Sequence, residues 1–363
     1  MVNEAPDNRP KRLYTTRNAE IDAKIQEIVH TLGTDEFDHQ LMAELMTSSY
    51  RLGQDGASTI DLKIINSAVK ELRYAFKVFQ PYRHLRKVAM FGSARTPSTK
   101  PAYKMAKEFG RLMTKAGWMM ITGAASGIMW AGHEGAGREA SFGLNIRLPF
   151  EQEANEVILN DPKLITCKYF FTRKLLFLKE SQATVLFPGG FGTLDEGFEC
   201  LTLVQTGKAT PRPIVFVDLS DGSFWKPLLK FMNEKLVKEG MVSPDDHSIY
   251  QVARSAKEAS QIIQRFYRVY HSLRYVDGKL VMRLTRPLSE KKVTQLSREF
   301  KDILVSGKIA QGPALAAEEN EQGDEPALRA LSRLVFHFNR RDFGRLTQLI
   351  HRINGPLPFS EQA

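Results

Sequence analysis

Apolar and polar positions along this chain follow a helical period first, a strand-and-helix pattern next, and a mixed pattern at the end. Over the first segment, apolar residues recur every three or four positions, which is typical of amphipathic helices. The helices predicted there cover residues 19–51, with a break at Gly33, and residues 59–79. We therefore expect a helical N-terminal extension over residues 1–84. Residues 1–11 are polar and rich in Pro, Asn and Arg, which predicts disorder.

Continuous apolar runs alternate with helical periods in the middle of the chain. Each run is short enough to be a buried strand, and glycine, small residues or proline follow it. The predicted strands are 88–92, 118–122, 144–148, 183–187 and 213–217, and the predicted helices are 101–116, 128–141, 169–181, 194–203 and 224–239. This alternation indicates an α/β fold, a Rossmann-like parallel sheet with helices on both faces. We assign it to residues 85–265.

The pattern changes again from about Tyr270. A hairpin around Asp277-Gly278, two helices and one further strand are predicted, at residues 273–284, 289–304, 343–353 and 334–338. We interpret residues 266–363 as a small α+β module. The acidic run from Glu318 to Glu325 is interpreted as a solvated loop.

Composition narrows the class of protein. The chain has 363 residues, 42% of them hydrophobic, which excludes disorder of the whole chain. A net charge of +10 favours anionic partners such as nucleotides, phosphosugars or nucleic acid. The only cysteines, Cys167 and Cys200, are too few for a disulfide framework or a four-ligand zinc site, and we expect both to be buried and reduced. Without a signal core or an apolar run near the ~20 residues of a membrane span, a cytoplasmic protein is expected.

The stretch from Ala183 to Glu196 combines a buried strand, a glycine turn and the start of a helix. That order builds an anion site, because the first amide N–H groups of a helix lack partners and the helix dipole adds positive potential. Thr193 is placed to cap the helix or to bind the ligand, and Glu196 falls one turn into the helix. The helix itself is predicted from the apolar residues Leu194, Phe198 and Leu201.

Two other strands also end in small residues, Gly92-Ser93 after the first and Gly123-Ala124-Ala125-Ser126-Gly127 after the second. Ligands of open parallel sheets bind outside the carboxyl ends of the strands. The turns after residues 91, 122 and 188 are therefore expected to line one site.

Pro188-Gly-Gly-Phe-Gly-Thr-Leu-Asp-Glu196 resembles the PGGxGTxxE signature of the "Lonely guy" (LOG) family, the cytokinin-activating phosphoribohydrolases often misnamed lysine decarboxylases. Thr172-Arg173-Lys174 resembles the Arg-Lys motif on the preceding helix of that family. The resemblance spans residues 88–241. It implies hydrolysis of the N-glycosidic bond of a nucleoside 5′-monophosphate, without a cofactor or metal, by a homodimer or higher oligomer. One departure affects substrate choice: Ala124-Ala125 stands where the family has a run of glycines.

The resemblance also implies roles for individual residues. Catalysis falls to Arg173 and Glu196, because a carboxylate beside the anomeric carbon stabilises oxocarbenium-like charge or activates water. Arg173 binds an anion or steers the leaving base. Substrate or phosphate contacts are implied for Gly92, Ser93, Gly123, Gly127, Lys174, Gly189, Gly190, Gly192 and Thr193.

Other functions remain open at this stage. A dinucleotide-binding enzyme is disfavoured because the sequence from Gly92 to Pro97 lacks GxGxxG spacing, and nothing marks a pyridoxal lysine. His133 and Glu134 lack a second ligand at helical spacing, so no metal site is predicted. The main rival is a non-catalytic nucleotide sensor or an RNA-associated protein. Its basic surface would be formed by arginines, but no aromatic-basic RNA signature accompanies them: Arg265, Arg268, Arg274, Arg340, Arg341, Arg345 and Arg352. The released base is not specified: adenine, a cytokinin-type adenine, guanine or a pyrimidine all stay open.

Overall fold

The computed structural model describes residues 14–33, 35–149, 153–219, 221–318 and 326–355 of the chain. It divides into two compact units, one formed by residues 7–73 and one that contains the chain from Tyr74 onward. The predicted disorder of residues 1–11 lies outside the described residues.

The smaller unit is helical, as predicted. It holds α1 (Ala19–His30), α2 (Glu36–Gln54) and most of α3 (Thr59–Phe79). The side chain of Asn18 accepts hydrogen bonds from the first amides of α1, and Asp35 does the same for α2, so both helices begin at a capping residue. The break expected at Gly33 is present between these two helices.

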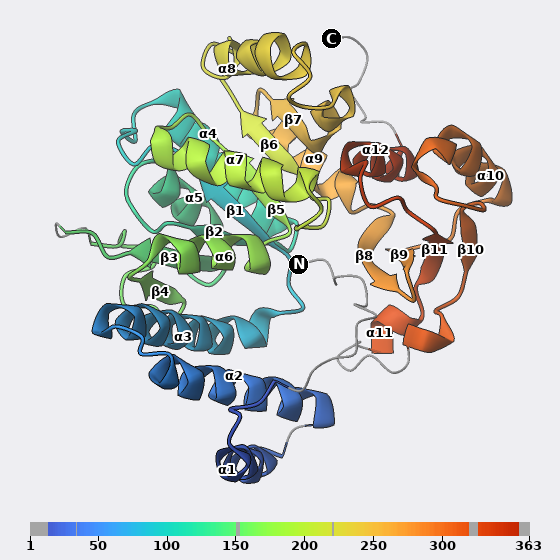
Figure 1. The fold of residues 1–363 in the computed structure, drawn as a ribbon. Helices are drawn as coiled ribbons and strands as arrows, with labels where there is room; N and C mark the ends of the chain where they lie inside the picture. The colour runs from blue at the N-terminus through green and yellow to red at the C-terminus, as the bar shows by residue number, and fades with distance from the viewer. Residues whose placement is uncertain (1–13, 34, 150–152, 220, 319–325, 356–363) are drawn as a thin grey trace. The chain divides into compact units, whose positions relative to one another are not determined.

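The larger unit contains a seven-stranded sheet in which every neighbouring pair is parallel, in the order β4-β3-β2-β1-β5-β6-β7 (Figure 1). The strands are β1 (Lys87–Phe91), β2 (Met119–Thr122), β3 (Ser141–Ile146), β4 (Leu164–Cys167), β5 (Ala183–Leu186), β6 (Ile214–Val217) and β7 (Tyr250–Ala253). The predicted α/β fold with a parallel sheet is confirmed. The two edge strands, β4 and β7, were not predicted, because they alternate or are only half-buried and so lack a continuous apolar run.

Helices cover both faces of this sheet, as expected. Contacts place α4 (Pro101–Lys115), α5 (Ile128–Ala136) and α9 (Ala256–Phe266) on one face, and α6 (Phe170–Glu180) and α7 (Phe191–Gln205) on the other. α5 is shorter than the predicted 128–141, because Gly137 adopts a positive φ of 80° and ends the helix five residues early. The helix predicted over 224–239 is α8 (Lys226–Phe231), which continues as the π-helical turn η2 (Met232–Val237).

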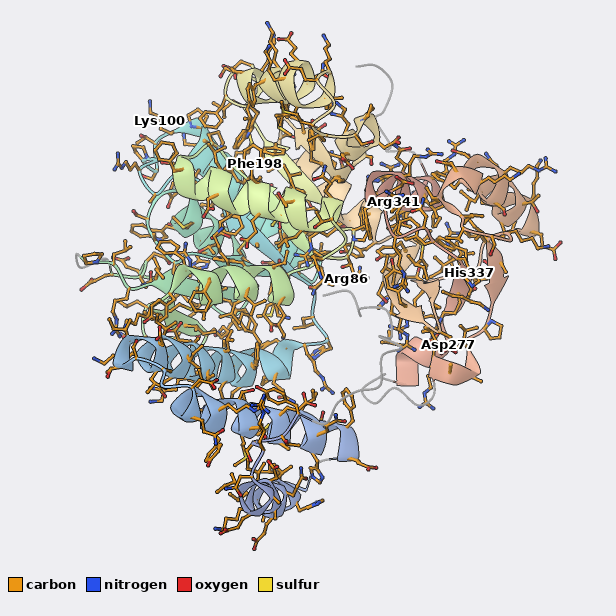
Figure 2. The ribbon with its side chains drawn as sticks, viewed as in Figure 1. Arg86, Lys100, Phe198, Asp277, His337 and Arg341 are labelled. Carbon is orange, nitrogen blue, oxygen red and sulfur yellow. The ribbon has the colours of Figure 1, made fainter. Side chains whose placement is uncertain are left out.

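A second sheet of four antiparallel strands follows, in the order β10-β11-β9-β8 (Figure 1). Its strands are β8 (Tyr270–Val276), β9 (Lys279–Leu284), β10 (Ala310–Gly312) and β11 (Ser332–Phe336), and its main helices are α10 (Glu290–Glu299) and α12 (Phe343–Asn354). The predicted hairpin is confirmed, with Asp277 at its tip (Figure 2). Short elements complete the chain: η1 (Gln80–Tyr82), η3 (Pro244–Ile249), η4 (Lys301–Ile303), η5 (Ala316–Glu318) and α11 (Pro326–Arg329).

One continuous hydrophobic core joins the two sheets. It runs from Val88 on β1 through Ile262 on α9 to Met282 on β9 and Ile350 on α12. The predicted boundaries at residues 84 and 265 therefore stay a proposal about the chain's organisation. Cys167 and Cys200 are buried and form no disulfide, as predicted. Among the described residues, no helix is long and apolar enough to cross a membrane.

Candidate active site

A cavity of about 620 Å³ opens at the carboxyl ends of β1, β2, β3 and β5. This volume lies in the range of ordinary ligand sites. The cavity is lined by Phe91, Gly92, Ser93, Ala94, Arg95, Gly123, Ala125, Met129, Asn145, Ile146, Arg173, Phe177, Gly190, Phe191, Gly192, Thr193 and Glu196. Most of the predicted site residues are among them. Gly127, Lys174 and Gly189 are not, and each has another role.

The first wall of the cavity is the start of α7. Gly190 precedes the helix without any side-chain cap. The amides of Thr193 and Leu194 donate to Gly190 O, so those of Phe191 and Gly192 are the ones left for a ligand among the described residues. Thr193 lies inside the first turn and is buried, so it does not cap the helix as was suggested. A Cβ at Gly189 would lie 2.2 Å from Thr193 Oγ1, and the tight turn therefore requires glycine there.

The second wall is the turn after β1, which ties the other two turns together. The backbone N–H of Ser93 donates to Pro188 O at 3.0 Å, and Ile128 N donates to Ser93 O at 3.0 Å. Gly127 allows the second link, because its φ is 65° and a Cβ there would lie 2.3 Å from Ser93 O. The three predicted turns thus converge on one cavity.

The turn after β2 contains Ala124, which has a positive φ of 59° that alanine rarely adopts. Thr122 Oγ1 accepts from Ala124 N at 3.0 Å, and Asn155 Nδ2 donates to the carbonyls of Ala124 and Ala125 at 3.0 and 3.2 Å. These bonds hold the turn in its left-handed conformation. Hydrogen bonds to the side chains of Thr122 and Asn155 therefore hold this turn, whereas the family pattern has glycines there.

His133 stands behind that turn and is fully buried. Its ring contacts Thr122 Oγ1 at 3.0 Å, Phe142 O at 3.1 Å and the side-chain amide of Asn155. Burial lowers the pKa of His133 to about 4, so the ring is neutral at physiological pH. His133 supports the turn, and the part of the chain that the structure describes contains no group of His, Cys, Asp and Glu side chains that could hold a metal ion.

Glu196 and Arg173 face each other at the cavity. Glu196 projects from the inner face of α7 and is 3% exposed, and the Arg173 guanidinium on α6 lies 3.6 Å from its Oε1. That distance is too long for a hydrogen bond. Within the described residues, neither Glu196 Oε1 nor Arg173 Nε has a hydrogen-bond partner. Buried polar atoms without partners are costly, and here both belong to the wall of a cavity.

The environment of Glu196 also changes its protonation. Burial raises the pKa of Glu196 to about 7, and the nearby charges of Lys174 and Arg173 offset only part of that effect. Its carboxyl is therefore close to half-ionised at neutral pH. A group with this property is suited to accept or donate a proton during a reaction.

Lys174 lies outside the cavity lining, on the outer side of Glu196. Its Nζ is 2.8 Å from Asp195, 2.9 Å from Glu199 and 3.8 Å from Glu196 Oε2. Burial opposes its charge, but the hydrogen bonds to Asp195 and Glu199 outweigh burial and raise the pKa of Lys174. Lys174 thus links α6 to α7 and keeps a positive charge beside Glu196.

Several cavity residues were missed by the sequence reasoning. Asn145, at the carboxyl end of β3, is a polar residue within an apolar strand, and that position was the available signal. Met129, Ile146 and Phe177 carry no such signal, because their apolar side chains are ordinary in a core. The remaining missed lining residues are Phe91, Ala94, Arg95 and Phe191.

The apolar residues that predicted α7 do not form its buried face. That face consists of Thr193, Glu196, Gly197, Cys200 and Val204. Phe198 projects from the outer side of α7 and is 36% exposed (Figure 2). A smaller apolar cavity of about 100 Å³ lies between α7, η2 and η3, and among the described residues that line it no buried side-chain polar atom lacks a hydrogen-bond partner.

The parallel sheet, its helices on both faces and the ligand-sized cavity at the carboxyl edge define a Rossmann-like α/β protein. Residues 122–263 match a family model described as "Possible lysine decarboxylase". A rice (Oryza sativa subsp. japonica) protein described as a probable cytokinin riboside 5′-monophosphate phosphoribohydrolase is 30% identical over 179 residues, which cover 48% of this chain and 69% of that protein. The chain belongs to the LOG family, as its motifs predicted.

Three other relatives match over shorter stretches. A cytokinin riboside 5′-monophosphate phosphoribohydrolase of Arabidopsis thaliana is 35% identical over 94 residues, or 26% of this chain. The chain spans 42%, 38% and 37% of three such relatives, which is about two fifths of their length. Among solved structures, a molybdenum cofactor carrier protein from Chlamydomonas reinhardtii aligns with a TM-score of 0.35 and 19% identity, over 50% of this chain and 97% of that one.

Proposed function

We propose that this protein hydrolyses the N-glycosidic bond of a nucleoside 5′-monophosphate and releases a free base and ribose 5-phosphate. The observation that carries the proposal is the pair of Glu196 and Arg173. Both are largely buried, both have an atom without a hydrogen-bond partner among the described residues, and both line the cavity that α7 faces with its first amides. Membership of the LOG family supports the same reaction.

In this proposal the 5′-phosphate binds the amides at the start of α7, from Gly190 to Gly192, because the amide of Thr193 already donates to Gly190 O. Helix N-termini favour such anions through unpaired N–H groups and the helix dipole. The net charge of +10 adds long-range attraction for the substrate. The ribose then lies beside Gly92 and Ser93, within the same cavity as Glu196.

The chemical step uses water and two side chains. Water bonds to the anomeric carbon as the bond from that carbon to the base nitrogen breaks, and the electron pair of that bond leaves with the base. Glu196, in its ionised form, accepts a proton from the water and stabilises the positive charge that develops on the ribose. Arg173 stabilises the anionic character of the leaving base, which finally takes up a proton.

A panel of nucleoside 5′-monophosphates tests the reaction. Free base and ribose 5-phosphate are followed by chromatography for the wild-type protein, for Glu196→Gln and for Glu199→Gln. Glu199 is a matched control because it lies on the same helix and pairs with Lys174 without lining the cavity. We expect release by the wild type and by Glu199→Gln, and a loss of about 100-fold or more in Glu196→Gln, the scale of a lost general base.

Two outcomes would contradict the proposal in different ways. Tight binding of nucleotides with no base released from any of them would indicate the nucleotide sensor instead. Base release that Glu196→Gln leaves unchanged would keep the reaction and remove the proposed site.

A homo-oligomer is part of the same proposal. Phe170 and Phe171 on α6 and Phe191 on α7 are 50%, 53% and 92% exposed, and Phe191 also lines the cavity. Large aromatic side chains exposed together are typical of protein contacts. Sedimentation equilibrium tests this expectation, and a monomer at micromolar concentration would contradict it.

A further inference from the structure

The cavity has two chemically different ends along the edge of the sheet. The phosphate-type end belongs to β5 and α7. The other end belongs to β3, which is separated from β5 by β1 and β2 in the strand order. Three strand spacings put these ends roughly 14 Å apart. A nucleotide whose phosphate binds α7 therefore directs its base, the group farthest from the phosphate, toward β3.

Apolar side chains dominate the β3 end. Ile146 and Met129 line it, and the Met129 thioether lies directly above Gly123, 2.9 Å from where a Cβ of that residue would be. A flat base fits between such groups. Asn145 is the polar side chain that β3 contributes to the lining.

The orientation of the Asn145 amide is fixed by its own backbone. The N–H of Ile146 donates to Asn145 Oδ1 at 2.9 Å. An N–H donor requires the oxygen on that side, so the NH₂ group occupies the other position. Within the described part of the chain, Asn145 Nδ2 has no hydrogen-bond partner. At this end of the cavity, the NH₂ group of Asn145 keeps both of its donors, while one of the two acceptor positions of Oδ1 is already used, so an acceptor on the ligand is the better match.

We propose that Asn145 selects nucleotides whose base carries a carbonyl at its far edge, as 6-oxopurines do, over those that carry an amino group there. This inference rests on the proposed function, because it assumes that a nucleoside monophosphate binds with its phosphate at α7. A carbonyl accepts a hydrogen bond from Nδ2. An amino group at the same position places two donors against each other, and both lose their partners on leaving water.

Inosine and adenosine 5′-monophosphates give the sharpest comparison, because they share one ring system and differ at the 6-position. The measured quantity is the ratio of kcat/KM for the two nucleotides. We expect the wild-type protein to favour the inosine nucleotide by about tenfold, the scale of one hydrogen bond gained and one mismatch avoided.

Substitutions at Asn145 test the cause of that preference. In Asn145→Asp one oxygen keeps the bond from Ile146 N–H and the other becomes an acceptor, so the ratio should shift by about tenfold or more toward the adenosine nucleotide. Asn145→Leu, of similar volume, should bring the ratio close to one. Asn233→Asp makes the same chemical change at an exposed position on η2 and should leave the ratio unchanged. Circular dichroism verifies that each variant is folded.

Binding to the Glu196→Gln protein, measured by calorimetry, separates the inference from the reaction. If no base is released but the bound nucleotides show the same preference and the same reversal in the Asn145→Asp double variant, the inference stands and the hydrolase proposal falls. If base is released without preference, or with a preference that Asn145→Asp leaves unchanged, the inference is overturned and the reaction stands. If neither nucleotide binds or reacts, both fall.

Discussion

Two buried glutamates in this protein lie beside arginines, yet they differ in protonation. Glu196 is 3% exposed and Glu318 is 4% exposed. Glu318 accepts hydrogen bonds from Arg333 at 2.9 and 3.2 Å and from Arg274 at 2.7 Å. Glu196 approaches Arg173 only to 3.6 Å. Burial opposes the charge of both carboxyls. At Glu318 the hydrogen bonds from the arginines outweigh burial, so the pKa of Glu318 is lowered. At Glu196 burial dominates and raises the pKa to about 7.

The difference separates a structural cluster from a candidate site. Both carboxylate oxygens of Glu318 accept charge-assisted hydrogen bonds, and these bonds join strands β8 and β11 of the four-stranded sheet. Glu196 retains an unsatisfied oxygen toward an open cavity. Perturbed carboxyls in cavities are typical of catalytic positions, because their cost to the fold is offset only by a ligand or by function.

Glu318→Gln should have the largest effect on stability. It leaves Arg333 and Arg274 buried beside a neutral amide, and breaking a buried ion cluster in this way costs about 3–5 kcal/mol. Chemical denaturation followed by circular dichroism measures the free energy of unfolding. Glu299→Gln is the control, because Glu299 pairs with the exposed Arg352 and should change stability by less than about 1 kcal/mol. Equal effects of the two variants would remove the distinction between the sites.

Glu196→Gln should shift stability in the opposite direction. The folded pKa of about 7 lies above the ordinary value of 4.5, so the contribution of this carboxyl to stability is complete below about pH 4.5 and is lost as the pH rises through 7. Glutamine does not ionise and avoids that loss, which amounts to roughly 1–3 kcal/mol. Thermal unfolding should show a gain for Glu196→Gln at pH 8 and little or none at pH 5. A loss of stability at pH 8 would show that the carboxylate is stabilised in the fold.

The pH dependence of base release gives a smaller and independent test. Because the proposed mechanism uses the ionised form of Glu196, kcat/KM should rise with pH around a midpoint near 7. One unit below that midpoint the rate should be about tenfold lower than its plateau. Glu199→Gln removes one of the smaller causes of the raised pKa of Glu196, so the midpoint should fall slightly while the rise with pH persists. A profile that is flat between pH 5 and 9 would exclude this role for Glu196.

The smallest expected effect concerns the turn after β2, which borders the same cavity. Ala124→Gly removes a buried methyl group but relieves the positive φ of 59°, so the two contributions should cancel to within about 1 kcal/mol. Ala125→Gly is the matched control, because Ala125 has no positive φ and should lose about 1–2 kcal/mol from the added chain entropy and from its own buried methyl group. Denaturation curves that rank Ala124→Gly as the more destabilising variant would contradict this account of the turn.

Much of the fold could be predicted because the apolar pattern of each central strand matches its buried position in the sheet. The central strands are buried on both faces, so they read as apolar runs ended by glycine, and the carboxyl ends of such strands must meet at one edge. That rule was enough to place Gly92, Gly123, Gly190 and Glu196 around one cavity. The LOG motifs lie on those same turns and on α6, so the family followed from the sequence as well.

The prediction failed where partners distant in the sequence decide the outcome. The apolar stripe of α7 gave the helix but not its orientation, since Phe198 is exposed while Thr193, Glu196 and Cys200 are buried. The acidic run was predicted to be solvated, which is wrong at Glu318, and the rest of that run lies outside the described residues. Arg274 lies on a strand that precedes Glu318 in the sequence, and Arg333 lies on a strand that follows it. The residues next to Glu318 in the sequence do not indicate either partner.

The sequence by itself determined the alternation of central strands and helices, the edge of the sheet that carries the candidate site, and the family, because these depend on periodicity and on local motifs. Only the tertiary structure decided which charged groups are satisfied. Glu196 and Glu318 are the same residue type with similar burial, and the difference lies in the number and geometry of the hydrogen bonds that other strands and helices bring to them. Such bonds set the pKa of a buried carboxyl, and they form only when distant segments pack together.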